Sequence, residues 1–256
     1  MPKPQNLKTI SSMKTVVIIP SRLNSSRFPR KALFPILGKP MIQHVYERAS
    51  LIPETNGVYV ASDSDEIKDC VLGFGGEHIF TSSTHQTGTD RLAEDAEILE
   101  LDGRDIVINV QGDQPALDPN HAKLLEYVLK ERGANYEAST LAIKFTNADE
   151  VDSPNHVKVV TALDGRAIYF SRAKIPFARV GEVTYFRHIG VYAYLAGFLR
   201  HYVTLPQSIL ERAESLEQLR ILEHGFSIKV QLVTGASPEV DVPEDVEKAE
   251  SAIRAL

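Results

Sequence analysis

The chain has 256 residues, of which 43% are hydrophobic and 24% charged, so it is long enough to bury the core of one large domain. Its formal net charge of −6 argues against a general binder of nucleic acid or anionic membranes, so any basic site must be local. The single cysteine, Cys70, excludes an internal disulfide framework and favours a reducing compartment.

The N-terminal segment differs from the rest of the chain. Residues 1–12 are polar and lack the apolar core of a signal peptide, so we interpret them as a disordered extension before a domain that spans residues 13–256. No apolar run approaches the roughly 20 residues that a membrane helix needs. These features predict a cytoplasmic protein without a membrane partner.

Predicted strands and helices alternate through the first half of the chain. Residues 16–19 are apolar and mostly β-branched, which is typical of a strand buried on both faces, and Pro20 ends the run. The later elements follow from apolar spacing and glycine stops: strands over 57–61, 79–80 and 105–110, and helices over 40–49, 64–74, 88–101 and 119–132. This alternation predicts an α/β fold with a Rossmann-like, mostly parallel sheet and helices on both faces.

The pattern changes at Ser139. Expected strands over 139–143, 157–163, 167–171 and 188–194 have little helix between them. We therefore predict a β-rich insert over about 139–195. A single amphipathic helix over 213–224, a strand over 228–233 and a closing helix over 243–255 complete the α/β frame.

The loop after the first strand carries the cations Arg22, Arg27, Arg30 and Lys31 between small residues. Such a loop suits a polyphosphate, although taken alone it could equally be a solvated basic loop. Ligands of parallel sheets bind beyond the carboxyl ends of the strands. We therefore expect Arg22, just past the first strand, to lie near Gln111 and Asp113, which follow the strand over 105–110.

Two aspartates are candidate ligands of Mg²⁺, which binds few protein carboxylates. Asp113 follows a buried strand, and Asp241 lies between the last strand and the last helix. The alternative for Asp113 is to cap the following turn, and for Asp241 to cap the last helix. Carboxylates that face a cationic loop would suit phosphoryl or nucleotidyl transfer.

Ordered sequence blocks carry a family resemblance from Met13 nearly to the C-terminus. The blocks are Ile18-Ile19-Pro20-Ser21-Arg22, Gly38-Lys39-Pro40-Met41-Ile42, Gly88-Thr89-Asp90-Arg91-Leu92-Ala93-Glu94, Gln111-Gly112-Asp113, Val157-Lys158-Val159-Val160, Tyr169-Phe170-Ser171-Arg172, His188-Ile189-Gly190-Val191-Tyr192, Leu216-Glu217-Gln218-Leu219-Arg220 and Val240-Asp241-Val242-Pro243-Glu244-Asp245. In that order they resemble the CMP-Kdo synthetases (3-deoxy-manno-octulosonate cytidylyltransferases), which have a nucleotide-diphospho-sugar transferase fold.

The resemblance implies a Mg²⁺-dependent enzyme that joins CTP to 3-deoxy-manno-octulosonate (Kdo), giving CMP-Kdo and pyrophosphate for lipopolysaccharide biosynthesis. It implies that Arg22, Arg27 and Lys31 contact the triphosphate and that Asp113 and Asp241 hold the metal. Family members are typically homodimers, and the resemblance implies that the insert contributes to the dimer interface. It also implies that the insert contributes to the sugar pocket.

The remaining site residues come from the same resemblance. Arg172 matches the position that meets the sugar carboxylate, and Gln111 one that lies between nucleotide and sugar. The positions that line the sugar pocket are His188, Tyr192, Glu217 and Gln218. The block that resembles the cytosine pocket contains Ser82, His85 and Gly88. Without the family, His188 would be a satisfied histidine beside a strand and Tyr192 a core aromatic.

Three departures from the family pattern leave the exact sugar open. Gln114 stands where glutamate is common, the loop between Pro176 and His188 is short, and residues 23–25 replace an aromatic or small residue. Some relatives activate an 8-amino variant of the sugar, 8-amino-3,8-dideoxy-manno-octulosonate, which is the alternative substrate.

Two other classes of function are weighed against this interpretation. Asp63-Ser64-Asp65 matches the Asp-x-Asp metal pattern of glycosyltransferases that consume a nucleotide sugar. The alternative for this stretch is a helix N-terminus capped by Ser62 or Asp63. A non-catalytic nucleotide-binding regulator is the second rival, and it would not require two metal carboxylates.

Overall fold

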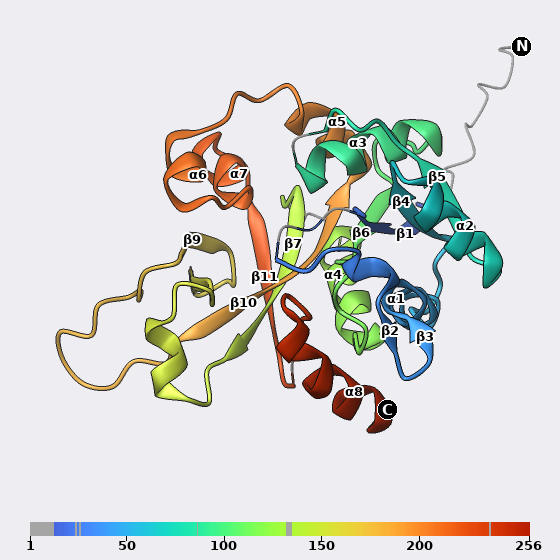
Figure 1. Ribbon diagram of the computed structural model, residues 1–256. Coiled ribbons are helices and arrows are strands. Elements are labelled where there is room, and N and C mark those ends of the chain that lie inside the picture. The colour runs from blue at the N-terminus through green and yellow to red at the C-terminus, as the bar shows by residue number, and fades with distance from the viewer. Residues whose placement is uncertain (1–12, 24, 26, 86, 132–134, 236) are drawn as a thin grey trace, which may run out of the picture.

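The computed structural model describes residues 13–23, 25, 27–85, 87–131, 135–235 and 237–256 (Figure 1). The expected extension over residues 1–12 lies outside these ranges. Within them, no helix is both long and apolar enough to cross a membrane.

A central sheet organises the chain, with strands in the order β11-β7-β10-β6-β1-β4-β5 (Figure 1). The strands are β1 (Thr15–Pro20), β4 (Val58–Ser62), β5 (Glu77–Phe80), β6 (Ile106–Asn109), β7 (Ala138–Lys144), β10 (Phe186–Leu195) and β11 (Ile228–Val233). β1 pairs in parallel with β4 and β6, β4 with β5, and β11 with β7, whereas β10 runs antiparallel to β6 and β7. The mostly parallel sheet is therefore confirmed.

Helices cover both faces of the sheet, as expected. Along β1, Val16 and Ile18 belong to one core and Val17 and Ile19 to the other, because successive side chains of a strand point to opposite faces. The first core takes in α3 (Gly88–Ile98), α5 (Ala196–Tyr202) and α7 (Gln218–Glu223). The second takes in α1 (Met41–Ala49), α2 (Asp65–Gly73) and α4 (Pro119–Lys130).

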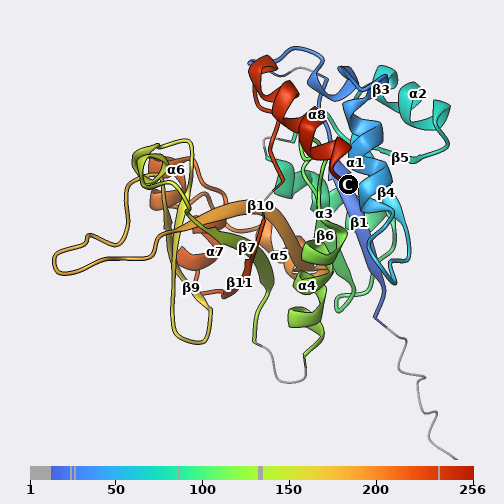
Figure 2. The ribbon, with the colours of Figure 1, turned by 90° about the horizontal axis from the view of Figure 1, so that it is seen from below.

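The C-terminal helix closes the fold near its beginning. Residues of α8 (Val246–Arg254) pack with Phe28, Ile36 and Met41 in a third small core, and α8 lies beside α1 in Figure 2. A 3₁₀ turn, η3 (Pro243–Asp245), precedes α8, so the expected helix over 243–255 begins with a tighter turn. The sequence patterns did not predict η1 (Lys31–Leu33) or the paired two-residue strands β2 (Pro35–Ile36) and β3 (Lys39–Pro40). Ile36 of β2 belongs to the same small core, whereas η1 packs through Ala32 and Leu33 against the second core.

The segment over 139–195, expected as a β-rich insert, contains four strands of the nine-stranded sheet. β7 and β10 belong to the central sheet, and only β8 (Lys158–Thr161), β9 (Ala167–Ser171) and η2 (Ala148–Asp152) lie off its path. β8 and β9 form an antiparallel pair that joins β10 through Arg187 and Lys158. In Figures 1 and 2 this outlying part projects away from α1 and α2.

The expectation of one helix over 213–224 is wrong. The structure has α6 (Ile209–Glu214) and α7, separated at Ser215, whose φ of 52° is left-handed. A capping box between Ser208 and Glu211 starts α6 earlier than the apolar spacing suggested. The break turns Glu217 to the N-cap of α7. For the helix expected over 119–132, the described part ends at Lys130, and residue 132 lies outside the described ranges.

Candidate functional site

Lys31 lies between the two predicted metal carboxylates. Its Nζ is 2.7 Å from Asp113 Oδ2 and 3.6 Å from Asp241 Oδ1. Arg27 donates to Asp241 Oδ1 at 3.0 Å. The structure thus brings the basic loop after β1, the turn after β6 and the segment before α8 to one edge of the sheet, where the carboxyl ends of β1 and β6 meet.

Backbone contacts hold both aspartates in place without using their carboxylates. The amide of Val240 donates to the carbonyl oxygen of Asp113 at 2.9 Å, which ties the two segments together. Asp245 Oδ2 accepts the amides of Asp241 and Val242 at 3.0 and 3.1 Å. Asp245 is therefore the capping residue, and the carboxylate of Asp241 stays directed at the cations. The alternative capping role for Asp241 does not fit this geometry.

Glu239 is a further carboxylate at this edge that the sequence patterns missed. Desolvation raises its pKa, and the neighbouring Asp113 and Asp241 raise it further. Gln114 is 2% exposed, and its Nε2 donates to Glu239 Oε1 at 3.1 Å. The one signal available in the sequence was that Glu239 directly precedes the Val240-Asp241 block.

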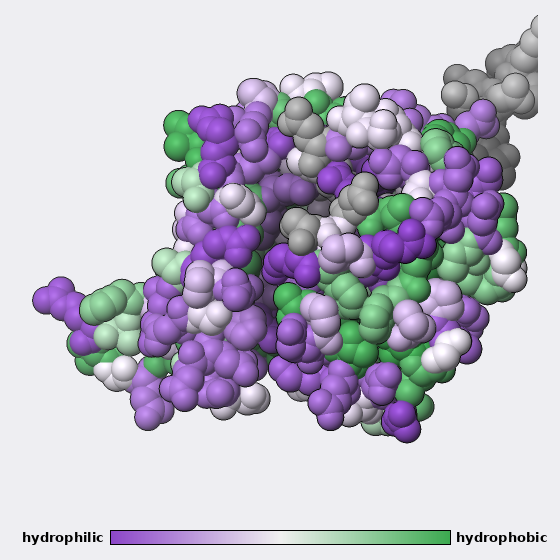
Figure 3. Space-filling view, in the orientation of Figure 1, coloured by the Kyte–Doolittle hydropathy of each residue, from purple (hydrophilic) through white to green (hydrophobic). Residues whose placement is uncertain are grey.

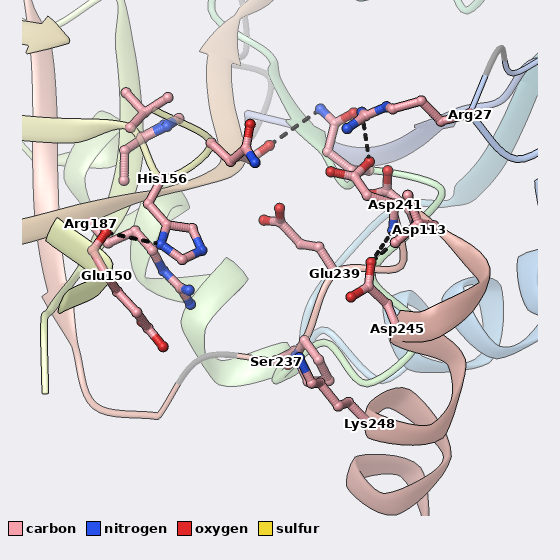
Figure 4. A pocket seen from close by; sticks show the side chains of 17 residues that line it. Arg27, Asp113, Glu150, His156, Arg187, Ser237, Glu239, Asp241, Asp245 and Lys248 are labelled. Atoms are coloured by element: carbon pink, nitrogen blue, oxygen red, sulfur yellow. Dashed lines mark hydrogen bonds and ion pairs between the residues drawn. The ribbon is translucent and has the colours of Figure 1, made fainter. Parts of the chain in front are cut away.

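A cavity of about 630 Å³ opens beside these residues (Figure 4). Arg27, Asp113 and Asp241 line one side, and His156 and Arg187 line the other, with Glu239 labelled between the two groups. The molecular surface is hollowed between the part that carries β8 and β9 and the rest of the molecule, and hydrophilic side chains surround much of that hollow (Figure 3). Such a cavity suits a large, charged ligand.

A second pocket of about 290 Å³ adjoins the first. Six of its lining residues are ones that the resemblance assigned to the nucleotide or the sugar: Gly88, Gln111, His188, Tyr192, Glu217 and Gln218. Gln111, His188 and Gly190 line both pockets, and Gln111 Nε2 donates to the Gly190 carbonyl at 3.2 Å. These three residues form a shared wall between the pockets.

Buried polar atoms in the second pocket lack partners among the described residues. They are the Asn109 Oδ1 and the Tyr192 hydroxyl, on residues that are 4% and 7% exposed. Unsatisfied buried polar atoms are costly, so a ligand that hydrogen-bonds them would be favoured. Glu217 is held in place because Thr89 donates its hydroxyl to Oε2 at 2.7 Å. The pocket therefore suits a polyhydroxylated molecule.

His188 sits at the shared wall as a neutral imidazole. Burial lowers its pKa to about 3. Its Nε2 lies 3.0 Å from the Thr140 hydroxyl, and its ring packs edge-on against Phe170. The histidine therefore offers a hydrogen-bonding atom to a ligand without bringing a positive charge.

Arg172 lies away from both pockets. Its Nε donates to the Glu214 carbonyl at 2.8 Å and its NH1 to the Pro154 carbonyl at 3.0 Å. The Glu214 carboxylate also accepts the Arg172 amide at 2.9 Å, so the end of β9 is fastened to α6. The contact with a sugar carboxylate that the resemblance implied for Arg172 therefore stays a prediction.

The residues assigned to the cytosine pocket lie in the loop between β5 and α3. Glu94 Oε2 accepts the Ser82 amide at 2.9 Å and contacts His85 Nε2 at 2.5 Å. Arg22 donates to the His85 carbonyl at 3.2 Å, which links this loop to the basic loop after β1.

The Asp-x-Asp stretch at residues 63–65 starts a helix. Ser64, rather than Ser62 or Asp63, is the N-cap of α2, and its hydroxyl accepts the Ile67 amide at 3.4 Å. Asp63 lies 3.8 Å from Arg91, and Asp65 lies 3.5 Å from Lys68. Each aspartate thus faces a different cation, and the pair does not form a shared metal site.

Comparisons with known proteins agree with this arrangement. The family model "Cytidylyltransferase" matches residues 16–230. The 8-amino-3,8-dideoxy-manno-octulosonate cytidylyltransferase of Shewanella sediminis (strain HAW-EB3) is 46% identical over 242 residues, covering 94% of this chain and 99% of that protein.

Two solved structures extend the comparison. A CMP:2-keto-3-deoxy-manno-octonic acid synthetase complexed with CTP is 41% identical, with a TM-score of 0.89 over 94% of this chain and 99% of its own. A cytidylyltransferase of Leptospira borgpetersenii serovar Hardjo-bovis (strain JB197) shares the fold, with a TM-score of 0.63 at 16% identity over 96% of this chain and 88% of its own.

Proposed function

The chain belongs to the cytidylyltransferases of the CMP-Kdo synthetase type, and on that basis we propose that it transfers CMP from CTP to an eight-carbon ulosonic acid. The convergence of Lys31, Asp113 and Asp241 beside the larger cavity carries the proposal. The sugar's anomeric oxygen bonds to the α-phosphorus, and the bond from that phosphorus to the bridging oxygen breaks. Pyrophosphate leaves with the electron pair, and the hydroxyl proton passes to solvent.

Cations at the sheet edge would bind and orient the triphosphate. Arg22, Arg27 and Lys31 follow the carboxyl end of β1, and Arg22 is already fixed by its bond to the His85 carbonyl. Positive charge placed before the reaction lowers the cost of building negative charge on the departing pyrophosphate. Ser82, His85 and Gly88 would form the neighbouring surface for the base.

Asp113 and Asp241 fit a Mg²⁺ ion, because their carboxylates already converge on one cation, the ammonium of Lys31. Carboxylate oxygens are suitable ligands for this hard ion, and phosphate and water would supply the others. When bound, Mg²⁺ would polarise the α-phosphate and lower the pKa of the attacking hydroxyl. Asp113 and Asp241 would hold such an ion at the sheet edge, beside the larger cavity that both residues line.

The second pocket would bind the sugar, through Gln111, His188, Tyr192, Glu217 and Gln218. Kdo is the sugar expected from the sequence resemblance. The 8-amino sugar is the second candidate, since the relative from Shewanella sediminis is named for it. Among the described residues, those that line this pocket include Glu217 with its carboxylate and no lysine or arginine, which favours a ligand end that carries an ammonium group.

The test is pyrophosphate release from CTP and Mg²⁺, run with Kdo, with 8-amino-Kdo and with no sugar. Release that requires either sugar supports the proposal, and the ratio of kcat/KM values identifies the preferred one. Binding of CTP with no product from either sugar would favour a non-catalytic regulator. Hydrolysis or transfer from a CMP-sugar, without pyrophosphate release from CTP, would favour a glycosyltransferase.

We also infer a homodimer that works in the cytoplasm, where CTP is made, and that supplies lipopolysaccharide biosynthesis. Large apolar side chains on and near the outlying β8–β9 part support a subunit interface there: Leu163, Ile168, Phe177 and Val180 are 111, 56, 86 and 88% exposed. Sedimentation equilibrium tests this inference. A dimer that dissociates in a Phe177→Asp variant would support it, and a monomeric parent protein would overturn it.

A further inference from the structure

Lys31 occupies the position that a metal ion would need. Its ammonium lies 2.7 Å from Asp113 Oδ2 and 3.6 Å from Asp241 Oδ1. Mg²⁺ binds carboxylate oxygens at about 2.0–2.1 Å, so both cations cannot share these two oxygens at close range. Repulsion between them would add to the steric conflict, because the lysine side chain is only 17% exposed and little water screens it.

The lysine side chain can move while its backbone stays in place. Lys31 begins η1, its amide bonds the Phe28 carbonyl at 3.2 Å, and its carbonyl accepts the Phe34 amide at 3.1 Å. Phe28 is buried and packs edge-on against Phe34. The backbone of this turn is thus anchored, whereas the flexible four-carbon stem can redirect the ammonium to a new partner.

A nucleotide would supply that partner. The triphosphate carries several negative charges, and the side chains of Arg22 and Arg27 place its expected site next to Lys31. An ammonium that turns from a carboxylate to a phosphate exchanges one charge-assisted hydrogen bond for another, so the exchange is inexpensive. The two aspartates would then be released to bind the metal together with the phosphate oxygens.

We propose that Lys31 is a resident countercation that keeps Mg²⁺ off Asp113 and Asp241 until nucleotide phosphates draw its ammonium away. Metal binding then depends on nucleotide binding, and the two are linked by a reciprocal coupling. This inference rests on the metal site of the proposed function. It goes beyond that function because it gives an order: the metal enters with the nucleotide or after it.

The test measures Mn²⁺ binding without nucleotide, by the electron paramagnetic resonance signal of free Mn²⁺. Lys31→Met and Lys31→Gln remove the charge, Lys31→Arg keeps it, and Asp113→Asn removes one metal ligand. Lys39→Met is the matched control, because it removes another lysine whose ion pair, with Glu47 at 2.8 Å, lies elsewhere. Thermal melting of each variant establishes that it is folded.

We expect the two neutral variants to bind Mn²⁺ at least about tenfold more tightly than the parent protein, since no charge-assisted hydrogen bond has to be broken first. Lys31→Arg and Lys39→Met should match the parent. Saturating CTP should raise the Mn²⁺ affinity of the parent by a larger factor than that of Lys31→Met.

Two results would overturn the inference, and they separate it from the metal site itself. Unchanged or weaker Mn²⁺ binding in both neutral variants, with binding lost in Asp113→Asn, would leave the metal site standing and reject the role of Lys31. Binding that is equally weak in the parent, the Lys31 variants and Asp113→Asn, even with CTP, would reject the metal site and the inference together.

Discussion

Asp95 predicts an unusual dependence of stability on pH. It lies in α3 with 0% exposure, and neither carboxylate oxygen has a partner among the described residues. Desolvation raises its pKa from 3.8 to about 8, although the neighbouring Arg91 guanidinium acts in the opposite direction. The carboxyl group is therefore protonated in the folded protein at neutral pH, whereas it is ionised in the unfolded chain.

The sign and size of the effect follow from proton linkage. Between pH 3.8 and about 8 the folded state holds a proton that the unfolded state has released, so the free energy of unfolding falls as the pH rises. Each pH unit in this window costs about 1.4 kcal/mol, which amounts to about 4 kcal/mol between pH 4 and pH 7. Above both pKa values the contribution no longer changes.

The perturbation is Asp95→Asn, and the assay is urea unfolding at pH 5, 6 and 7. The amide cannot ionise, so the stability of the variant relative to the parent should rise by about 1.4 kcal/mol per pH unit. The free energy of unfolding of the variant also carries a constant, pH-independent loss, because a buried amide without partners costs about 1–3 kcal/mol at every pH. An exposed aspartate, Asp149→Asn, is the control. Parallel curves for parent and Asp95→Asn would refute the reasoning.

Further predictions concern the site and a buried ion pair. Asp113→Ala and Asp241→Ala should each nearly abolish turnover in the pyrophosphate assay with little change in thermal melting; near-normal activity in either would reject that residue as a metal ligand. Arg220→Ala should lower the free energy of unfolding in urea by about 3–5 kcal/mol, because it leaves the buried Glu211 carboxylate, 2.5 Å from the guanidinium, without its cation; a loss below about 1 kcal/mol would contradict this. Gln114→Glu should lower the melting temperature progressively above about pH 5. The reason is that it places a second carboxyl group beside Glu239, whose Oε1 the Gln114 amide now contacts at 3.1 Å. A melting temperature with the same pH dependence as the parent protein would argue against that contact.

The sequence predicted the features that depend on local pattern and chain direction. Apolar β-branched runs identified β1 and β6. The rule that ligands bind beyond the carboxyl ends of parallel strands predicted that Arg22 would lie near Gln111 and Asp113, and in the structure Lys31 of the same loop contacts Asp113. The resemblance added Glu217, which by spacing alone belongs to the solvated face of a helix. The structure places it in a pocket because the chain breaks at Ser215.

Other features depend on tertiary contacts that no spacing encodes. The left-handed backbone at Ser215 ends α6, and no glycine marks this turn in the sequence. Glu239 joins the acidic edge through Gln114, a residue 125 positions earlier in the chain. The Arg172 guanidinium donates hydrogen bonds to the carbonyl oxygens of Pro154 and Glu214. A sequence motif can match the arginine to a family position, but it cannot predict these two partners.

The antiparallel strand β10 explains why the two pockets adjoin. It pairs with β6 so that Tyr192 lies opposite Asn109, and its earlier residues therefore run past the carboxyl end of β6. There the pairing with β7 shifts register between Ile189 and Tyr192, an irregularity that redirects side chains and is common next to active sites. If β10 ran parallel to β6, the residues that precede Tyr192 would extend beyond the amino end of β6 instead. Their side chains would then lie far from Gln111. The reversal of one strand thus places the second pocket, with its hydrogen-bonding side chains, directly against the charged edge, as a reaction between a sugar hydroxyl and a bound triphosphate requires.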